Sequence, residues 1–198
     1  MKSILIKKRS APRVDEFYAL LRETPVISAV RSEDKLEECL ARGSGIVFIL
    51  FGDILTIPGI VARIKNSGKM ALVHLDLIEG LAAKEVALDF LWEETAADGI
   101  LSTKANLIRC GKSRGFLTVE RFFMLDSQAL LNVQRQFPLE HADAVEILPG
   151  VMAKVIRQIV QITKKPVIAG GLIADKEDIH NALAAGAAAV STSNLNLL

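Results

Sequence analysis

The stretch PVIAGGLIADKEDIHNALAAGAAAVSTSN, residues 166–194, contains the strongest indication of the fold. It reads as an apolar strand, a helix and a second apolar strand, with Asp175 as a candidate N-cap and Gly186 ending the helix. A unit of this kind predicts two parallel strands joined by a crossover helix. Two glycines follow the first strand and three hydroxyl residues follow the second, so the stretch also raises the question of a phosphate site.

The same alternation extends along the whole chain. Eight short apolar runs, separated by segments of helical periodicity, are candidate strands: residues 25–30, 45–51, 70–75, 99–103, 116–120, 144–148, 166–169 and 187–191. Their spacing is too wide for hairpins and suits strand–helix units. We therefore expect an α/β fold, a small parallel (β/α)8 barrel of the TIM type, with an open doubly wound sheet as the alternative.

The chain of 198 residues is expected to form a single domain. Residues 1–24 would be an N-terminal extension and helix, and residues 25–194 the barrel. The chain ends at Leu198, so a truncated last helix is expected. The amphipathic segment 13–22 would then cover the resulting gap or plug the barrel floor.

Composition restricts the classes of function. Hydrophobic residues make up 51% of the chain and aromatic residues 5%, which indicates an aliphatic core. A net charge of +1 excludes a strongly basic protein, so any nucleic-acid binding would need a local patch. Cys39 and Cys110 lie far apart in predicted helices and are expected to be reduced thiols. No apolar stretch of about 18 residues occurs, so we expect a cytoplasmic protein without a membrane partner.

Polar residues gather where the strands are expected to end, which is the working face of a β/α barrel. Gly170 and Gly171 would let a phosphate approach the backbone, while Ser191 and Thr192 would supply hydroxyl donors. Barrels of this type frequently bind phosphate after strands seven and eight. The alternative is that the glycines form a tight turn and the hydroxyl residues cap a short terminal helix.

Three further strand-end residues are candidates for binding the rest of a ligand. Asp76 could accept a hydroxyl or act as a general base, or it could be a turn cap close to a packed His74. Lys104 could pair with an anion or form a Schiff base, or simply be solvated. Glu146 lies inside an apolar run, where an unpaired carboxylate is costly. The chain lacks HxH, HExxH and CxxC spacings, so no metal site is expected.

One region has local basic character with interleaved phenylalanines, a mixture that suits phosphate contacts and base stacking. Its members are Lys104, Arg109, Lys112, Arg114 and Arg121. The alternative is a solvated helix face beside core aromatics. A second basic group, in residues 7–13, is no more specific.

Six blocks, VHLDLIEGL, GILSTK, VERFFMLDS, VEILPG, PVIAGGLI and GAAAVSTSN, resemble in order and spacing the glycerol-3-phosphate-responsive antiterminators, the glycerol uptake operon antiterminator regulatory proteins. The resemblance covers about residues 20–194 and implies a small β/α barrel that is a regulator, not an enzyme. It also implies glycerol 3-phosphate as effector, no cofactor, and binding to the leader mRNA of glycerol-operon genes that prevents termination.

By position, the resemblance implies that Gly170, Gly171, Ser191 and Thr192 hold the phosphate, with Asp76, Lys104 and Glu146 at the glycerol end. The RNA surface on residues 104–121 is our own hypothesis. Glu120 stands where the family pattern has glutamine, and the C-terminus is shorter than usual.

Fold and phosphate cradle alone do not separate a sensor from an enzyme. The rival function is therefore an isomerase, lyase or aldolase that acts on a sugar phosphate, with Lys104 or Glu146 as the base. A phosphate-binding scaffold is a third option, and a homo-oligomer is left open.

Overall fold

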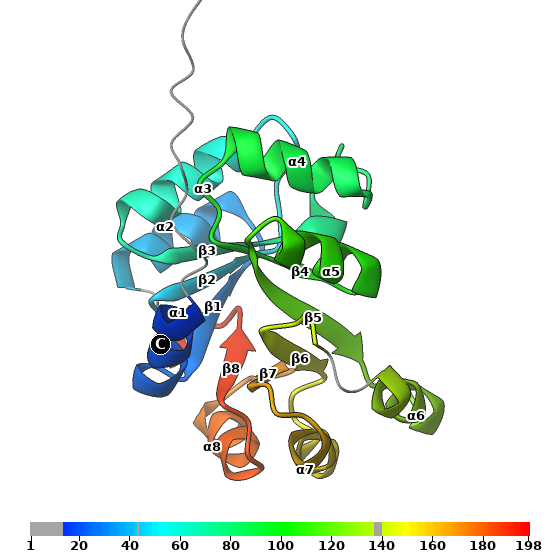
Figure 1. Ribbon diagram of the computed structural model, residues 1–198. Helices are drawn as coiled ribbons and strands as arrows, with labels where there is room; N and C mark the ends of the chain where they lie inside the picture. The colour runs from blue at the N-terminus through cyan, green and yellow to red at the C-terminus, as the bar shows by residue number, and fades with distance from the viewer. Residues whose placement is uncertain (1–13, 43, 137–139) are drawn as a thin grey trace, which may run out of the picture.

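The computed structural model describes residues 14–42, 44–136 and 140–198, and these residues form a closed barrel of eight parallel strands (Figure 1). Each strand pairs with the next one in the sequence, and β8 pairs with β1 to close the ring. The prediction of a (β/α)8 barrel is confirmed, and the open sheet alternative is wrong. Closure joins two strands that are separated by nearly the whole sequence.

The strands follow the predicted apolar runs to within one or two residues, with one exception. They are β1 Val26–Val30, β2 Ile46–Ile49, β3 Met70–His74, β4 Gly99–Ser102, β5 Leu117–Phe123, β6 Ala144–Leu148, β7 Val167–Gly170 and β8 Ala189–Thr192. The exception is β5, which continues beyond Glu120 for three residues. A charged pair, Glu120 and Arg121, had suggested the end of the strand, but both side chains are buried.

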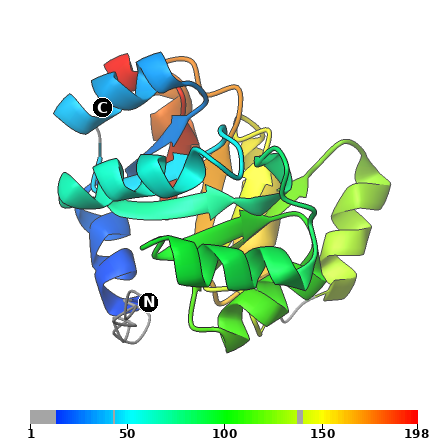
Figure 2. The ribbon, with the colours of Figure 1, turned by 90° about the horizontal axis from the view of Figure 1, so that it is seen from above.

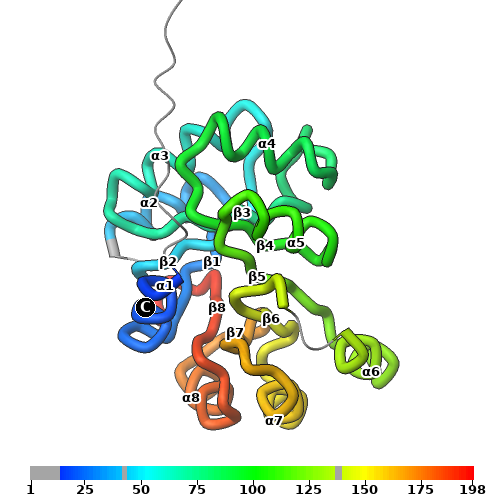
Figure 3. The backbone as a smooth tube through the Cα atoms, viewed as in Figure 1, coloured from blue at the N-terminus to red at the C-terminus, as the bar shows by residue number. Residues whose placement is uncertain are grey.

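Eight helices accompany the strands in the described part of the chain, and Figure 3 traces how they surround the barrel. They are α1 Val14–Glu23, α2 Glu33–Arg42, α3 Ile57–Asn66, α4 Glu85–Glu94, α5 Ala105–Ser113, α6 Ser127–Gln136, α7 Ala153–Ile162 and α8 Lys176–Ala184. The cap predicted for α8 is present, since the Asp175 carboxylate accepts a hydrogen bond from the Asp178 amide (2.9 Å). After β8 a single 3-10 turn, η2 (Leu195–Leu197), stands where the truncated last helix was expected.

The core has two layers because successive side chains of a strand point to opposite faces. One set of buried aliphatic residues packs between the strands and helices α2–α8, and a second set fills the barrel interior. Helix α1 contributes to the second set, since Phe17 and Leu21 pack with interior residues such as Phe48. The Tyr18 hydroxyl also donates to the Asp143 carbonyl (2.9 Å).

Helix α1 therefore plugs the end of the barrel at which the strands begin, one of the two roles predicted for it. Figure 2 shows α1 and the C-terminal turn at opposite ends of the barrel. Helix α1 covers one end of the interior, and we call the other end, where the strands end, the strand-end face. No helix in the described residues is long and apolar enough to cross a membrane. Cys39 in α2 and Cys110 in α5 are free thiols.

Candidate functional site

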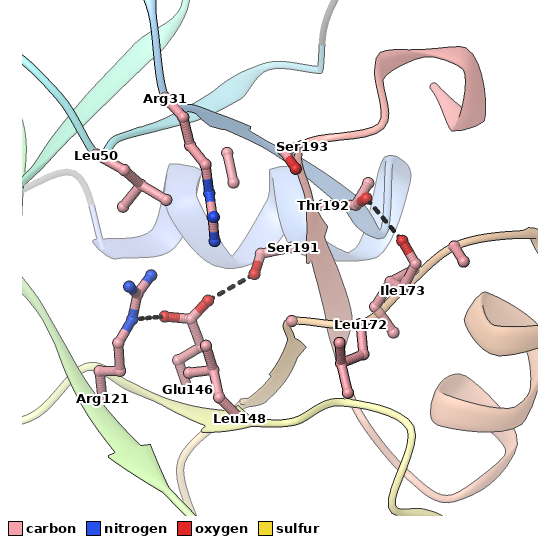
Figure 4. Close-up of a pocket in the computed structure, with 13 residues that line it drawn as sticks. Arg31, Leu50, Arg121, Glu146, Leu148, Leu172, Ile173, Ser191, Thr192 and Ser193 are labelled. Atoms are coloured by element: carbon pink, nitrogen blue, oxygen red, sulfur yellow. Dashed lines mark hydrogen bonds and ion pairs between the residues drawn. The ribbon is translucent and has the colours of Figure 1, made fainter.

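A cavity of about 350 Å³ lies at the strand-end face, above the apolar interior (Figure 4). Its walls come from β1, β5, β6 and β8 and from residues that directly follow β1, β2, β7 and β8. The polar and charged side chains in the wall are Arg31, Arg121, Glu146, Ser191, Thr192 and Ser193. A small concave site with a few converging polar groups is typical of a ligand pocket.

Glu146 is the centre of the polar network, and it is fully buried. The Arg121 Nε donates to its Oε2 (2.5 Å), and the Ser191 hydroxyl donates to its Oε1 (2.5 Å). Arg121 and Glu146 stand opposite one another in the β5–β6 pairing, so the sheet register positions this contact. A carboxylate buried in this way is tolerated only because the ion pair and the hydroxyl replace its lost hydration.

Arg31 brings a second guanidinium to the same cavity. It follows β1 directly, and its side chain extends into the pocket towards Arg121, Glu146 and Ser191 (Figure 4). Among the described residues that line the cavity, two arginines therefore face one carboxylate, which leaves a net positive charge. Two guanidiniums directed at one cavity repel each other, and an anion placed between them relieves this repulsion. The pocket is therefore suited to an anionic ligand.

The loops after β7 and β8 form the opposite wall, as the phosphate hypothesis requires. Gly171 lines the cavity with φ of +74°, a conformation that favours glycine. Leu172 follows at φ +60°, which is unusual for a bulky side chain. The Thr192 hydroxyl donates to the Ile173 carbonyl (3.1 Å) and so ties the two loops together.

Gly170 belongs to the interior rather than to the cavity wall. A Cβ atom at this position would lie 2.5 Å from Glu146 Oε1 and 2.6 Å from Ser191 Oγ. Glycine is needed here so that the Glu146–Ser191 hydrogen bond can form beside β7. Of the four residues predicted for the phosphate, the structure thus brings Gly171, Ser191 and Thr192 to the cavity and places Gly170 beneath it.

Asp76 and Lys104 do not line this cavity. The Asp76 carboxylate accepts hydrogen bonds from the Ser102 hydroxyl (3.0 Å), the Thr103 amide (2.8 Å) and the Thr103 hydroxyl (3.1 Å). It therefore fixes the loop after β4. Lys104 is exposed, and its backbone amide donates to the Ser102 hydroxyl (3.1 Å) before α5 begins. Of the three residues predicted for the glycerol end, only Glu146 reaches the pocket.

His74 lies at the end of β3 and is almost fully buried. Burial, together with the positive charge of Arg121, lowers the pKa of the imidazole to about 4. Its Nδ1 atom has no hydrogen-bond partner within the described residues. His74 is therefore neutral near pH 7 and adds no positive charge beside Arg121.

The structure does not bring together the five basic residues predicted to bind RNA. Arg121 lies in the pocket, while Lys112 pairs with the largely buried Asp143 (2.5 Å) and Arg114 with Asp89 (2.7 Å). Lys104 and Arg109 are exposed, and the Arg109 Nη2 donates to Asn106 (2.6 Å). Of these five residues, Lys104 and Arg109 are thus the exposed cations that make no ion pair with another described residue.

Two charged residues of the pocket, Arg31 and Arg121, were not among the predicted ligand-binding residues. Arg121 was assigned to an RNA surface, and Arg31 was placed at the expected working face, directly after the first strand, but without a specific role. The alternation of side chains along LTVERFF could have placed Arg121 in the barrel. Arg121 lies two and four residues after Val119 and Leu117, which point into the interior, so its side chain is on the same face of the strand. The position of Arg31 directly after the first apolar run indicates the working face, but its approach to Arg121 and Glu146 depends on barrel closure.

Fold and pocket define the class: a parallel β/α-barrel protein with a cationic cavity at its strand-end face. The model of the glycerol-3-phosphate responsive antiterminator family matches residues 26–198, and the chain belongs to this family. The family is one of regulators rather than enzymes.

Relatives agree with this assignment. The chain is 43% identical over 175 residues to the uncharacterized protein YgcP of Escherichia coli K12, covering 88% of this chain and 92% of that protein. A glycerol uptake operon antiterminator regulatory protein from Listeria monocytogenes has 34% identity and a TM-score of 0.83, covering 87% of this chain and 93% of that one. An antiterminator-related protein from Thermotoga maritima has 33% identity and a TM-score of 0.78, covering 88% and 97%.

Barrel enzymes share the fold alone. The N-acetylmannosamine-6-phosphate 2-epimerase of Clostridium perfringens has a TM-score of 0.66 at 15% identity, covering 89% of this chain and 88% of that one. Such a likeness concerns architecture and carries no activity to this chain.

Proposed function

We propose that this protein binds glycerol 3-phosphate in the strand-end cavity and, in the bound form, binds the leader mRNA of glycerol-utilisation genes and prevents transcription termination. The observation that carries the proposal is the convergence of Arg31 and Arg121 on a cavity with a single carboxylate, in a chain that belongs to this family. Of the rival enzyme's candidate bases, Lys104 lies outside the cavity and Glu146 is held by Arg121 and Ser191.

The two ends of the ligand fit different walls of the pocket. A phosphate between Arg31 and the loops at Gly171 and Ser193 would gain a charge-assisted contact and the close approach that glycine permits. The glycerol hydroxyls would then face Glu146 and Ser191. There they can donate hydrogen bonds to the Glu146 carboxylate. A ligand lacking either end would leave one set of buried polar groups unsatisfied.

Regulation requires that the ligand prefer the RNA-competent form through contacts of its own. The cavity joins Arg31 after β1 to the β5–β6 ion pair and to the loops after β7 and β8. A ligand that contacts all three would order these segments relative to one another. The gain in RNA affinity would equal the gain in ligand affinity caused by RNA, because coupling between two sites is reciprocal.

The test uses Arg31→Gln beside a matched control, Arg22→Gln, which changes an exposed arginine on α1. Titration calorimetry with glycerol 3-phosphate, glycerol and inorganic phosphate should show the tightest binding for glycerol 3-phosphate. Loss of a charge-assisted contact should weaken binding of glycerol 3-phosphate at least about tenfold in Arg31→Gln and leave Arg22→Gln unchanged.

Filter binding of a labelled leader transcript completes the test. The unmodified protein should bind the transcript more tightly when glycerol 3-phosphate is present, and Arg31→Gln should need a correspondingly higher ligand concentration. RNA affinity that does not change when glycerol 3-phosphate is added would refute regulation by this ligand. Turnover of a sugar phosphate, followed by NMR, would instead support the enzyme hypothesis.

A further inference from the structure

The outer surface of α6 and α7 carries positive charge that the protein itself does not neutralise. Its basic side chains lie on the two helices and in the turn after α7: Arg135, Lys154, Arg157, Lys164 and Lys165. None of them makes an ion pair with another described residue, and all except the half-buried Lys165 are exposed. We call this the α6–α7 face.

Acidic residues are scarce in the same part of the chain. Between Glu146 and Asp175 the sequence contains no acid at all. Glu146 is in the pocket, and Asp143 is buried and paired with Lys112. Of the acids in residues 123–174, only Asp126, which caps the start of α6, and Glu140 are exposed. Coulomb repulsion among these cations is therefore offset mainly by solvent and salt.

The other side of the barrel behaves differently. On α2 and α3, Lys35 pairs with Glu38 (2.9 Å), and Arg63 pairs with Glu33 and Glu37. Further round, Lys65 pairs with Asp98 (2.6 Å) and Arg114 with Asp89 (2.7 Å). These cations are already matched and gain less from an external anion. A net charge near zero for the whole chain thus conceals a cationic side.

The α6–α7 face also carries the other groups that a polynucleotide uses. The exposed Gln128, Asn132 and Gln161 are amides of the kind that donate to phosphate oxygens. Phe123 lies at the rim of the strand-end face, where β5 leads towards α6, and its side chain is on the same side of β5 as that of Arg121. It is 50% exposed, and an exposed aromatic ring can stack on an unpaired base.

We propose that the α6–α7 face is the surface on which this protein binds single-stranded RNA, with the cations on phosphates and Phe123 on a base. This inference rests on the proposed function, which supplies RNA as the partner, and it replaces the surface expected on residues 104–121. The face is also adjacent to the ligand site. Phe123 lies two residues after Arg121 on β5, and it stands opposite Leu148, which lines the cavity.

The test compares two triple variants that each remove three positive charges. Arg135→Gln/Arg157→Gln/Lys164→Gln alters the α6–α7 face. Lys84→Gln/Lys104→Gln/Arg109→Gln alters exposed cations at α4 and α5 and serves as the matched control. Binding to a labelled leader transcript is measured with saturating glycerol 3-phosphate at several salt concentrations, and calorimetry with the same ligand verifies that each variant is folded.

The α6–α7 variant should lose at least about tenfold in RNA affinity, and the slope of log affinity against log salt should fall by up to about 2, since each phosphate contact on a single strand contributes about 0.7. The α4–α5 variant should keep both values. In addition, Phe123→Ala should weaken binding with an unchanged salt slope.

The possible results separate the inference from the proposed function. Equal losses in the two triple variants, or a loss confined to the α4–α5 variant, would overturn the α6–α7 face while leaving RNA binding intact. Failure of the unmodified protein to bind the transcript, with glycerol 3-phosphate bound, would overturn the proposed function itself.

Discussion

Glu120 and Arg121 are neighbours in the sequence but lie on opposite faces of β5. Arg121 points into the barrel and pairs with Glu146. Glu120 points towards the helix layer, where it is almost fully buried and its Oε1 has no partner within the described residues. Burial raises the pKa of the Glu120 carboxyl to about 7. An acid next to an arginine in the sequence therefore need not weaken that arginine's contacts, because the strand separates them.

Glu120 should make stability depend on pH. Its pKa in the folded state lies above the ordinary value of 4.5, so folding favours the protonated form. The associated stability is fully present below about pH 4.5 and is lost as the pH rises through 7, a change of about 3 kcal/mol. We expect Glu120→Gln to be increasingly more stable than the unmodified protein between pH 5 and pH 8.

Urea unfolding at pH 5, 6, 7 and 8 measures this difference directly. Glu93→Gln, which removes an exposed carboxylate on α4, is the control and should follow the unmodified protein at every pH. Parallel pH profiles for Glu120→Gln and the unmodified protein would contradict the prediction.

At the scale of elements, α1 closes the floor of the barrel, the end at which the strands begin. An amphipathic helix before β1 was predicted to cover a gap or plug the floor, and its packing on the interior cluster decides for the plug. The barrel strands are short, four to seven residues, and α1 adds buried apolar side chains to the interior cluster.

Phe17→Ala tests the plug. Removing a fully buried ring from the interior should lower the free energy of unfolding by about 3–5 kcal/mol, because lost burial and a residual cavity add together. Arg22→Ala, on the same helix but exposed, should change it by less than about 0.5 kcal/mol. A loss below about 1 kcal/mol for Phe17→Ala in urea unfolding would show that α1 is dispensable.

At the scale of the whole molecule, closure of the ring assembles the pocket. The β1–β8 pairing places Arg31 beside the loops after β7 and β8, about 140 to 160 residues later in the sequence. A ligand held by both ends of the chain stabilises the closed barrel over the unfolded chain, since the unfolded chain has no such site.

Glycerol 3-phosphate at a hundred times its dissociation constant should therefore raise the free energy of unfolding by about 2.7 kcal/mol. Arg31→Gln at the same ligand concentration should gain markedly less. Equal concentrations of sodium sulfate provide the control for ionic strength in the urea unfolding measurement. Identical stabilisation by sulfate would contradict specific binding of the phosphorylated polyol.

The sequence alone determined the barrel and the position of the glycine and hydroxyl loops after β7 and β8. Strand parity, helix periodicity and the glycines at 170–171 are local signals, because side-chain direction along a strand repeats every two residues. Glu146 could also be recognised, since a carboxylate within an apolar run requires partners. These features depend on residues close together in the chain.

Only the tertiary structure decided which residues share the pocket and which cations stay unpaired. Arg31 meets Arg121 through closure between β1 and β8, whereas Asp76 is taken up by the loop after β4. Lys112 and Arg114, cationic in the sequence, are matched by Asp143 and Asp89. The physical reason is that such contacts join elements distant in sequence, so their geometry exists only after the sheet has closed and the helices have packed.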